Sequence, residues 1–226
     1  LDQTENALHM ALGESETAPA QARGLFVAAL REAFEESGVL FADNADPAMT
    51  RNAMQMMRDG VPFNQILAQL QLRLNTSMLA PWSRWITPKM ASVSTKRFDT
   101  RFFVAAIPEA QVARHDDFET TESVWLSPRA ALEQYWARDI ELAPPQIMSL
   151  SHLARHKTVD TVLAEARNKT PPLICPEPHD HNGERVLCYP GDERHSIAAR
   201  ALPGPTRLIY RNRRFEPASG FEALFQ

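Results

Sequence analysis

The sequence has little of several features that would narrow its function at once. Two cysteines, Cys175 and Cys188, among 226 residues are too few for a disulfide framework, and their spacing is not that of a metal site. No apolar run approaches the roughly eighteen residues that a membrane-spanning helix needs. The first residues, LDQTENALHM, lack the basic and apolar parts of a signal peptide. We therefore expect a cytoplasmic, reducing setting and no membrane partner.

Positive charge is not in excess either. The chain has 24 lysines and arginines against 28 acidic residues, which gives a formal net charge of -4. This balance argues against a general nucleic-acid binder, because phosphate contacts favour a basic domain. A hydrophobic content of 44% with 23% charged residues is ordinary for a globular protein, and the chain is long enough to bury a core without disulfides.

The hydrophobic pattern predicts helices, then strands, then helices, then strands. Helical spacing is found over 25–37, in two segments of 47–79 that are broken near DGVP, and over 127–139, 145–156 and 159–167. Strand-like segments are SRWITP, KRFDTRFFVAAIP and ESVWLSP, followed from Leu173 by LICPEP, RVLCYP and TRLIYRNRRF. This order predicts an α+β fold, or a layered α/β/α domain, that carries an added helical segment.

The segment ALREAFEESGVLF carries an unusual group of negative charges. On a helix, Glu32, Glu35 and Glu36 fall within an arc of roughly 100°. Like charges at these spacings destabilise a helix, and the helix dipole disfavours anions near the C-terminus. Arg31 can reach Glu35 one turn on, but one arginine cannot neutralise three carboxylates. Mg²⁺ or Mn²⁺ would, because these ions prefer oxygen ligands.

The segment REAFEESGV resembles the core of the Nudix box, whose family pattern is Gx5Ex7REUxEExGU with U an aliphatic residue. Its fixed positions are matched by Arg31, Glu32, Glu35, Glu36 and Gly38. The blocks WSRWITP, KRFDTRFF, VWLSPRAAL, LAPPQ and PGDE follow in an order similar to the coenzyme A diphosphatase branch of Nudix hydrolases. The mammalian peroxisomal member of that branch carries an insertion inside its Nudix box.

The chain departs from the family pattern at the front of the box. The first glutamate of the pattern falls on Arg23 and its glycine on Thr17. In the insertion-bearing branch the glycine-rich part lies further upstream, so Leu1 and Asp2 are interpreted as its end. We expect residues 1–226 to form one Nudix hydrolase-like domain that lacks the N-terminal strands and glycine loop. The helical insertion is expected at about 47–79, and a C-terminal extension of helices and strands at about 143–226.

The resemblance implies an α/β/α sandwich with a mixed sheet and the hydrolysis of a diphosphate. The resemblance also implies a role for each matched position: Glu35 and Glu36 are the expected metal ligands, Glu32 is a third ligand or a base, and Arg31 orients a glutamate. Glu119 is the expected additional acid from a loop, with Glu122 as its alternative, although an acidic solvated loop is an equal interpretation.

Three other features leave alternatives open. Arg97 and Asp99, on one predicted strand, are candidates for substrate binding, against a structural ion pair of equal weight. HDHNGE, from His179 to Glu184, contains metal-ligand residue types, but Asn-Gly between two strands favours a hairpin turn. The two cysteines flank this turn, where ordinary buried cysteines are favoured over a disulfide.

Three functions remain open at this stage. The first is a Mg²⁺- or Mn²⁺-dependent diphosphatase that cleaves coenzyme A or acyl-coenzyme A to 3',5'-ADP and 4'-phosphopantetheine products. The second is a Nudix pyrophosphatase that acts on nucleotide sugars or dinucleotides. The third is a catalytically silent module that binds a nucleotide or a partner protein. The expected partner is a small-molecule diphosphate, not nucleic acid, and homodimer formation is left open.

Overall fold

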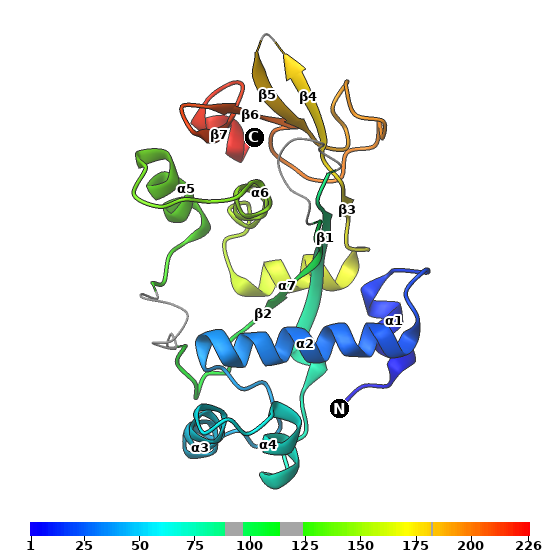
Figure 1. The fold of residues 1–226 in the computed structure, drawn as a ribbon, viewed down its shortest axis with the longest axis vertical. Helices are drawn as coiled ribbons and strands as arrows, with labels where there is room; N and C mark the ends of the chain where they lie inside the picture. The colour runs from blue at the N-terminus through cyan, green and yellow to red at the C-terminus, as the bar shows by residue number, and fades with distance from the viewer. Residues whose placement is uncertain (89–96, 114–123, 182) are drawn as a thin grey trace. The chain divides into compact units, whose positions relative to one another are not determined.

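The structure is a computed structural model that describes residues 1–88, 97–113, 124–181 and 183–226 (Figure 1). The chain divides into two compact units. Unit 1 comprises Leu1–Pro81, Phe103–Val124 and Ala166–Thr170, and unit 2 comprises Trp82–Phe102, Trp125–Glu165 and Pro171–Gln226. Within the described ranges, no helix is both long and apolar enough to cross a membrane.

Unit 1 is built mainly from helices. These are α1 (Glu5–Leu12), α2 (Pro19–Ser37), α3 (Pro47–Arg58), α4 (Phe63–Gln69) and the short η1 (Thr76–Met78). Helices α1 and α2 pack side by side, and so do α3 and α4 (Figure 1). Thr4 caps α1 by accepting a hydrogen bond from the Ala7 amide, and Asp46 caps α3 by accepting one from the Met49 amide. The predicted break between two helices at DGVP is confirmed.

Helix α2 is longer than the sequence pattern indicates. It ends at Ser37 as predicted, but it begins at Pro19 and not near Leu25. Proline is favoured at the first helical position, and Ala22 is fully buried, so the first turns also face the core. The predicted start was wrong because the opening residues of α2 are mostly small or polar.

Unit 1 has a hydrophobic core beneath α2. Leu8, Leu12, Phe26 and Leu30 are each at most 2% exposed, and the ring of Phe103 packs edge-on against Phe26 with centroids 5.0 Å apart. A second cluster joins α2 to α3 and α4 through Phe34, Leu40, Ala53 and Ile66. These contacts bury one side of α2 and leave its other side in solvent.

A three-stranded sheet has the order β2-β1-β3. Its strands are β1 (Leu79–Ile86), β2 (Asp99–Ala105) and β3 (Leu173–Ile174). Strand β3 runs parallel to β1, with Arg84 opposite Leu173 and Trp85 opposite Ile174. The helical pattern extended to residue 79 was wrong at its end, because helix α4 stops at Gln69 and Leu74 forms an isolated bridge to Ala42.

Unit 2 adds a four-stranded antiparallel sheet and three helices. The sheet order follows the chain, through β4 (Glu177–His181), β5 (Glu184–Cys188), β6 (Arg207–Arg211) and β7 (Arg214–Pro217). The helices are α5 (Pro128–Ala137), α6 (Pro144–Leu153) and α7 (Val159–Asn168), and η2 (Phe221–Phe225) ends the chain. Ser127 caps α5 as predicted, with its Oγ accepting from the Ala130 amide at 3.2 Å.

Two β-hairpins, β4–β5 and β6–β7, test what the sequence predicted for HDHNGE and TRLIYRNRRF. Strands β4 and β5 pair with His181 opposite Glu184, so the hairpin predicted at HDHNGE is confirmed, with Gly183 at φ 80°. TRLIYRNRRF, expected as one strand, forms the β6–β7 hairpin because Asn212 and Arg213 adopt positive φ values of 50° and 66°. Both cysteines are free.

The predicted strand ESVWLSP is wrong over its described part. Residues 124–127 have no strand assignment, and the side chains of Val124 and Trp125 are 66% and 73% exposed. Aromatic and β-branched residues favour strands only where a neighbouring strand and a buried face are available. The predicted α+β class is confirmed.

Candidate functional site

The carboxylates of α2 lie on its exposed side because its apolar residues take the other. Leu30 and Phe34 are at most 1% exposed, whereas the side chains of Glu32 and Glu35 are 50% and 38% exposed. Gly38 ends the helix in the left-handed conformation, with φ 69°, and its amide donates to the Phe34 carbonyl at 2.9 Å. The sequence therefore presents Glu32, Glu35 and Glu36 near the end of a fixed helix.

Arg31 contacts two of these glutamates. Its Nη2 donates to Glu32 Oε1 in a short contact, and its Nε lies 3.4 Å from Glu35 Oε1. The hydrogen bond to Glu32, with the charge of Glu35, raises the pKa of Arg31 above its ordinary value. The expected contact to Glu35 is confirmed, and the contact to Glu32 adds a second. Arg31 thus contacts two carboxylates of this surface, and the orienting role that the resemblance implies for it stays a prediction.

The donor set of this surface fits a hard divalent cation. Its ligand atoms are carboxylate oxygens, which Mg²⁺ and Mn²⁺ prefer. The three glutamates do not form a closed cage, however: in the described parts of the chain, they are not among the groups whose ligand atoms all lie within 4.8 Å of one another. Open coordination of this kind suits an ion that shares its remaining ligands with water and a phosphorylated substrate.

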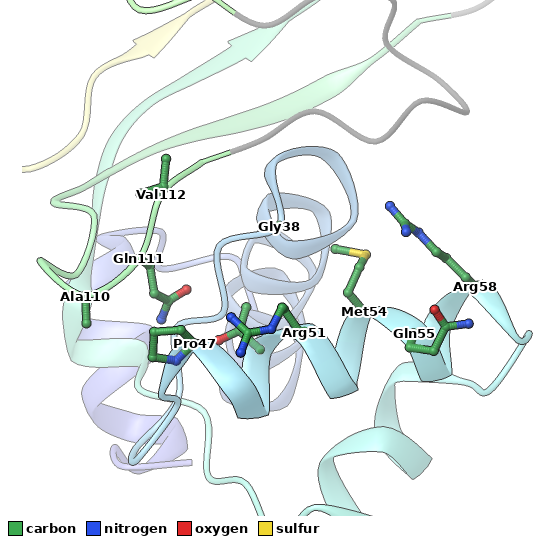
Figure 2. Close-up of a pocket in the computed structure, with 10 residues that line it drawn as sticks. Gly38, Pro47, Arg51, Met54, Gln55, Arg58, Ala110, Gln111 and Val112 are labelled. Atoms are coloured by element: carbon green, nitrogen blue, oxygen red, sulfur yellow. The ribbon is translucent and has the colours of Figure 1, made fainter.

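A cavity of about 460 Å³ opens beside the end of α2. Its walls come from Gly38, from α3, and from residues 110–112, all within unit 1. Figure 2 shows Arg51, Met54 and Arg58 on the side of α3 that faces the end of α2. Two guanidinium groups beside an apolar thioether make this cavity suitable for a ligand with both phosphate and apolar parts.

Gln111 fixes one wall of the cavity. Its Nε2 donates to the Leu40 carbonyl and its Oε1 accepts from the Leu40 amide, both at 2.8 Å. This double hydrogen bond holds the 110–112 segment against the chain that leaves α2. The segment that follows α2 and the cavity wall are therefore tied directly through Leu40.

The other predicted site residues belong to unit 2 or lie outside the described residues. Arg97 and Asp99 belong to unit 2, and α2 belongs to unit 1. Asp99 accepts hydrogen bonds from Arg84 at 2.7 and 2.8 Å and forms an ion pair with Arg101 at 3.0 Å, and the substrate-binding role of Arg97 and Asp99 stays a prediction. The hydrogen bond from Arg84 has the largest effect and, with the positive charge of Arg101, lowers the pKa of Asp99 below its ordinary value. Arg97 Nε donates to the Thr87 carbonyl at 3.0 Å.

Glu119 and its alternative Glu122 lie outside the described residues. The role expected for them stays a prediction. Sequence reasoning missed Arg51, Arg58 and Gln111. The two arginines are seven residues apart on a predicted helix, which places them on one face and was an available signal. Gln111 follows no motif, so its contact with Leu40 could be found only in the structure.

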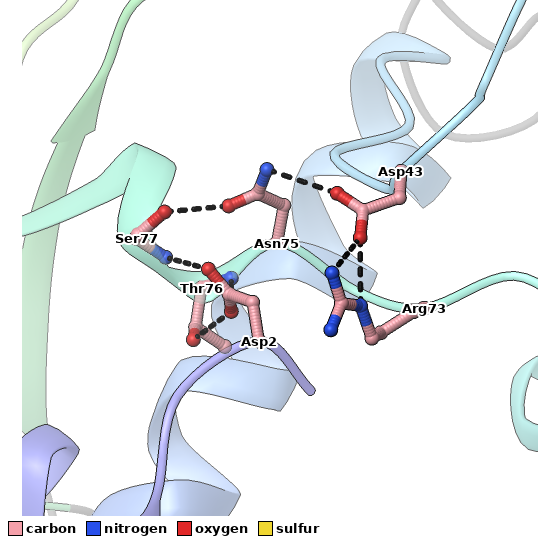
Figure 3. A network of polar contacts seen from close by, with 6 residues as sticks. All are labelled: Asp2, Asp43, Arg73, Asn75, Thr76 and Ser77. Atoms are coloured by element: carbon pink, nitrogen blue, oxygen red, sulfur yellow. Dashed lines mark hydrogen bonds and ion pairs between the residues drawn. The ribbon is translucent and has the colours of Figure 1, made fainter.

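The first residues of the chain are held by hydrogen bonds and an ion pair. Asp2 accepts hydrogen bonds from the Thr76 amide and hydroxyl, both at 2.6 Å, and from the Ser77 amide at 3.1 Å (Figure 3). Burial alone would raise the pKa of Asp2, but these donors outweigh it and lower the pKa to about 2. Arg23, where the family pattern has a glutamate, pairs with Glu5 at 2.8 Å. The first residues are thereby fixed to the chain around η1.

Comparisons with known proteins agree with the motif. The model of the NUDT19 Nudix domain matches residues 9–153. A Caenorhabditis elegans protein provisionally named nudix hydrolase 7 is 29% identical over 83% of this chain and 63% of its own length. The acyl-coenzyme A diphosphatases NUDT19 of Xenopus laevis and Homo sapiens are 28% and 31% identical over 59% and 57% of this chain.

The chain spans less than two thirds of the length of these relatives, with 40% of the Xenopus laevis protein and 38% of the human protein covered. No solved structure matched the chain. The family match covers well over half of the residues and includes the whole of α2 with its carboxylates. The chain therefore belongs to the NUDT19 Nudix domain family.

Proposed function

We propose that this protein is a divalent-metal-dependent Nudix hydrolase that cleaves coenzyme A or acyl-coenzyme A to 3',5'-ADP and 4'-phosphopantetheine or its acyl form. One observation carries the proposal: Glu32, Glu35 and Glu36 share one exposed helix surface, and Arg31 contacts two of them. Water adds across the P–O–P bridge, one P–O bond breaks, and two phosphate monoesters form, with release of two protons when both monoesters are fully ionised. Mg²⁺ or Mn²⁺, when bound, neutralises pyrophosphate oxygens and activates water.

The cavity beside α2 supports the choice of substrate class. Coenzyme A has a pyrophosphate, a 3'-phosphate and a long neutral arm. Arg51 and Arg58 supply fixed positive charge for phosphate, and Met54 supplies a soft apolar surface in the same cavity. The relatives named as acyl-coenzyme A diphosphatases point to the same class.

The first test measures turnover with and without one carboxylate. Glu36→Gln is expected to reduce hydrolysis of coenzyme A in Mg²⁺ or Mn²⁺ by at least about a hundredfold, because a metal ligand or charge is lost at the reacting phosphate. Glu109→Gln removes the same charge from an exposed position in unit 1 and should leave the rate unchanged. Equal rates for Glu36→Gln and the unchanged protein would contradict the proposal.

The second test is a substrate panel. Coenzyme A, an acyl-coenzyme A, a nucleotide sugar and a dinucleotide are offered at equal concentrations, and products are separated by chromatography. Preferential cleavage of the last two would replace the proposal with a Nudix pyrophosphatase of other specificity. Tight binding of all four without turnover, in the unchanged protein extended to the length of its relatives, would identify a silent binding module.

The third test concerns the arginines of the cavity. If Arg51 holds the 3'-phosphate, Arg51→Gln should raise KM for coenzyme A by about tenfold or more, since a hydrogen bond to a charged group contributes about 1.5–3 kcal/mol. It should change KM for 3'-dephospho-coenzyme A much less. The matched control is Arg23→Gln, which removes the same charge from an exposed position of unit 1 outside the cavity. An equal effect on both substrates would exclude a 3'-phosphate contact.

A further inference from the structure

Three side chains with metal-binding groups meet in unit 2, on helices other than α2. His152, His156 and Glu165 place their ligand atoms within 4.8 Å of one another, and across the described ranges no other trio of histidine, cysteine or acidic residues does so. His152 lies in the last turn of α6, and Glu165 lies in α7. The proposed function makes no use of this cluster.

The local chain fold brings the two histidines to one side. Beyond the end of α6 the backbone keeps turning, with the Arg155 amide donating to the His152 carbonyl at 3.2 Å and the His156 amide to Leu153 at 3.0 Å. Residues four apart on such a turn face the same way. Thr158 then starts α7, its Oγ1 accepting from the Thr161 amide at 3.3 Å. A connection of a few residues therefore determines the position of Glu165.

The cluster is largely enclosed. The side chains of His152 and His156 are 5% and 11% exposed, while that of Glu165 is 33% exposed. The indole of Trp82 packs against the His152 ring at a tilt of 39°, with centroids 4.4 Å apart, and meets the His156 ring edge-on at 6.1 Å. Trp82 thus fixes both ring planes, and the carboxylate side stays open to solvent.

The hydrogen bonds of Thr161 assign the proton of His156. The Thr161 hydroxyl donates to the Thr158 carbonyl at 2.8 Å, so its proton is used there. At its 3.2 Å contact with His156 Nδ1, Thr161 Oγ1 must then accept, and Nδ1 must carry a hydrogen. In the neutral ring this leaves the lone pair on Nε2. Such a hydrogen bond on the far nitrogen is how proteins orient a metal-binding imidazole.

The Nε2 lone pair of His156 faces a carboxylate. The Nε2 atom of His156 lies 2.8 Å from Glu165 Oε2. Within the described residues this buried nitrogen nevertheless has no hydrogen-bond partner, so the contact is too bent for a proton to bridge it well. The other oxygen, Oε1, lies 2.8 Å from His152 Nε2. Two lone pairs at this distance repel each other unless a cation lies near both. Ligands bonded at about 2.0–2.2 Å to one tetrahedral ion are about 3.3–3.6 Å apart, so a small outward shift of these side chains would admit the ion.

We propose that His152, His156 and Glu165 form a binding site for a transition-metal ion of the Zn²⁺ class, which links α6 to α7. Two imidazoles and one carboxylate are a donor set that suits Zn²⁺, and three protein ligands leave one position for water. The all-oxygen donor set of α2 suits harder ions. The chain thus carries two cation sites of different chemistry.

The experiment uses the full chain after removal of metals with a chelator. Zn²⁺ is titrated in the presence of a competing indicator, and bound metal is counted by elemental analysis. One equivalent of tightly bound Zn²⁺ and a rise in Tm are expected. His156→Gln and Glu165→Gln should each weaken Zn²⁺ binding by at least about tenfold. His9→Gln, which removes a histidine from α1, is the matched control and should bind as the unchanged chain does.

A second readout does not depend on the folding of any variant. Co²⁺ added to the unchanged, metal-free chain should give the visible d–d absorption typical of a site of low coordination number. Added Zn²⁺ should displace the Co²⁺ and abolish this absorption. The proposal is overturned if the folded chain takes up no Zn²⁺ in competition with the indicator. The cluster would then be a proton-bridged ion pair. The proposal is also overturned if the binding persists in both variants, or if Glu35→Gln abolishes it, since the ion would then lie on α2.

Discussion

Asp192 shows how one buried carboxylate makes stability depend on pH. Its side chain has no exposed surface, and Arg207 donates to its two oxygens at 2.7 and 2.8 Å. Thr206 Oγ1 and the Arg194 amide donate as well. Burial alone would raise the pKa of Asp192, but these donors outweigh it and hold the pKa at about 2. The stabilisation is present above the unfolded pKa near 4 and is lost as pH falls through about 2.

Asp192→Asn should lower the free energy of unfolding by about 3–5 kcal/mol at pH 7, because it leaves Arg207 without its buried partner. The difference from the unchanged chain should shrink between pH 4 and pH 2, where the native carboxylate also becomes protonated. Urea denaturation at both ends of this range measures it. Glu193→Gln is the control: Glu193 pairs with the same arginine at 2.8 Å but is 74% exposed, so we expect about 0.5 kcal/mol or less.

The two thiols should differ strongly in reactivity. Cys188 is fully buried, and burial followed by the charge of Asp192 raises its pKa to about 11. Cys175 is partly exposed. Because the thiolate is the nucleophile, a thiol reagent at pH 8 should modify Cys175 in the native chain and Cys188 only after unfolding. Cys188→Ala should abolish the modification that appears only after unfolding and should leave the modification of Cys175 unchanged. Rapid reaction of two thiols in the folded chain would contradict this prediction.

At the scale of elements, two glycines of α2 allow a matched test of the helix that carries the carboxylates. Gly38 caps the helix at φ 69°, where alanine is strained, so Gly38→Ala should lower the stability by about 1 kcal/mol. Gly24 lies inside the helix, and an added Cβ there would meet nothing within 4 Å. Gly24→Ala should raise the stability by about 0.5–1 kcal/mol. Thermal denaturation of both variants checks the signs.

The elements differ in how far the sequence could predict them. Helices α3, α5 and α7 carry local signals, such as the Ser127 cap and the Pro-Ala start of α3, and their bounds were predicted closely. Strand β1 begins at Leu79, four residues before the predicted segment, because Leu79 to Trp82 are buried on both sides and lack alternation. Positive φ at Asn212 and Arg213 divides β6 from β7 without any glycine, so the turn had no strong signal.

The same distinction applies to the site. Arg31 and the three glutamates follow a spaced pattern on one helix, and helical geometry alone places them together. The cavity beside them depends on the Gln111–Leu40 contact, and the His152, His156 and Glu165 cluster depends on the turn between α6 and α7. Such contacts join residues through backbone geometry that no short motif encodes. The carboxylate surface of α2 was therefore foreseeable from the sequence, but its surroundings were not.

At the scale of the whole molecule, unit 1 is assembled from three separate stretches of the chain. Phe103 covers Phe26, and Gln111 satisfies the backbone of Leu40, yet both follow residue 81 in the sequence. A fragment of residues 1–81 should therefore lose part of its core contacts and two hydrogen bonds. We expect it to unfold without a cooperative transition in circular dichroism, while the full chain shows one. A sharp transition in the fragment would contradict this expectation.

The close packing of Trp82 against His152 makes the indole a native optical reporter. A positive charge gained by the imidazole, from a proton or from a bound ion, acts directly on the face of the adjacent ring system. Emission from Trp82 should consequently change when that charge appears, without any attached dye. Comparison with a Trp82→Phe chain would isolate its signal from that of the other three tryptophans. The fold thus supplies its own fluorescent probe beside the histidines.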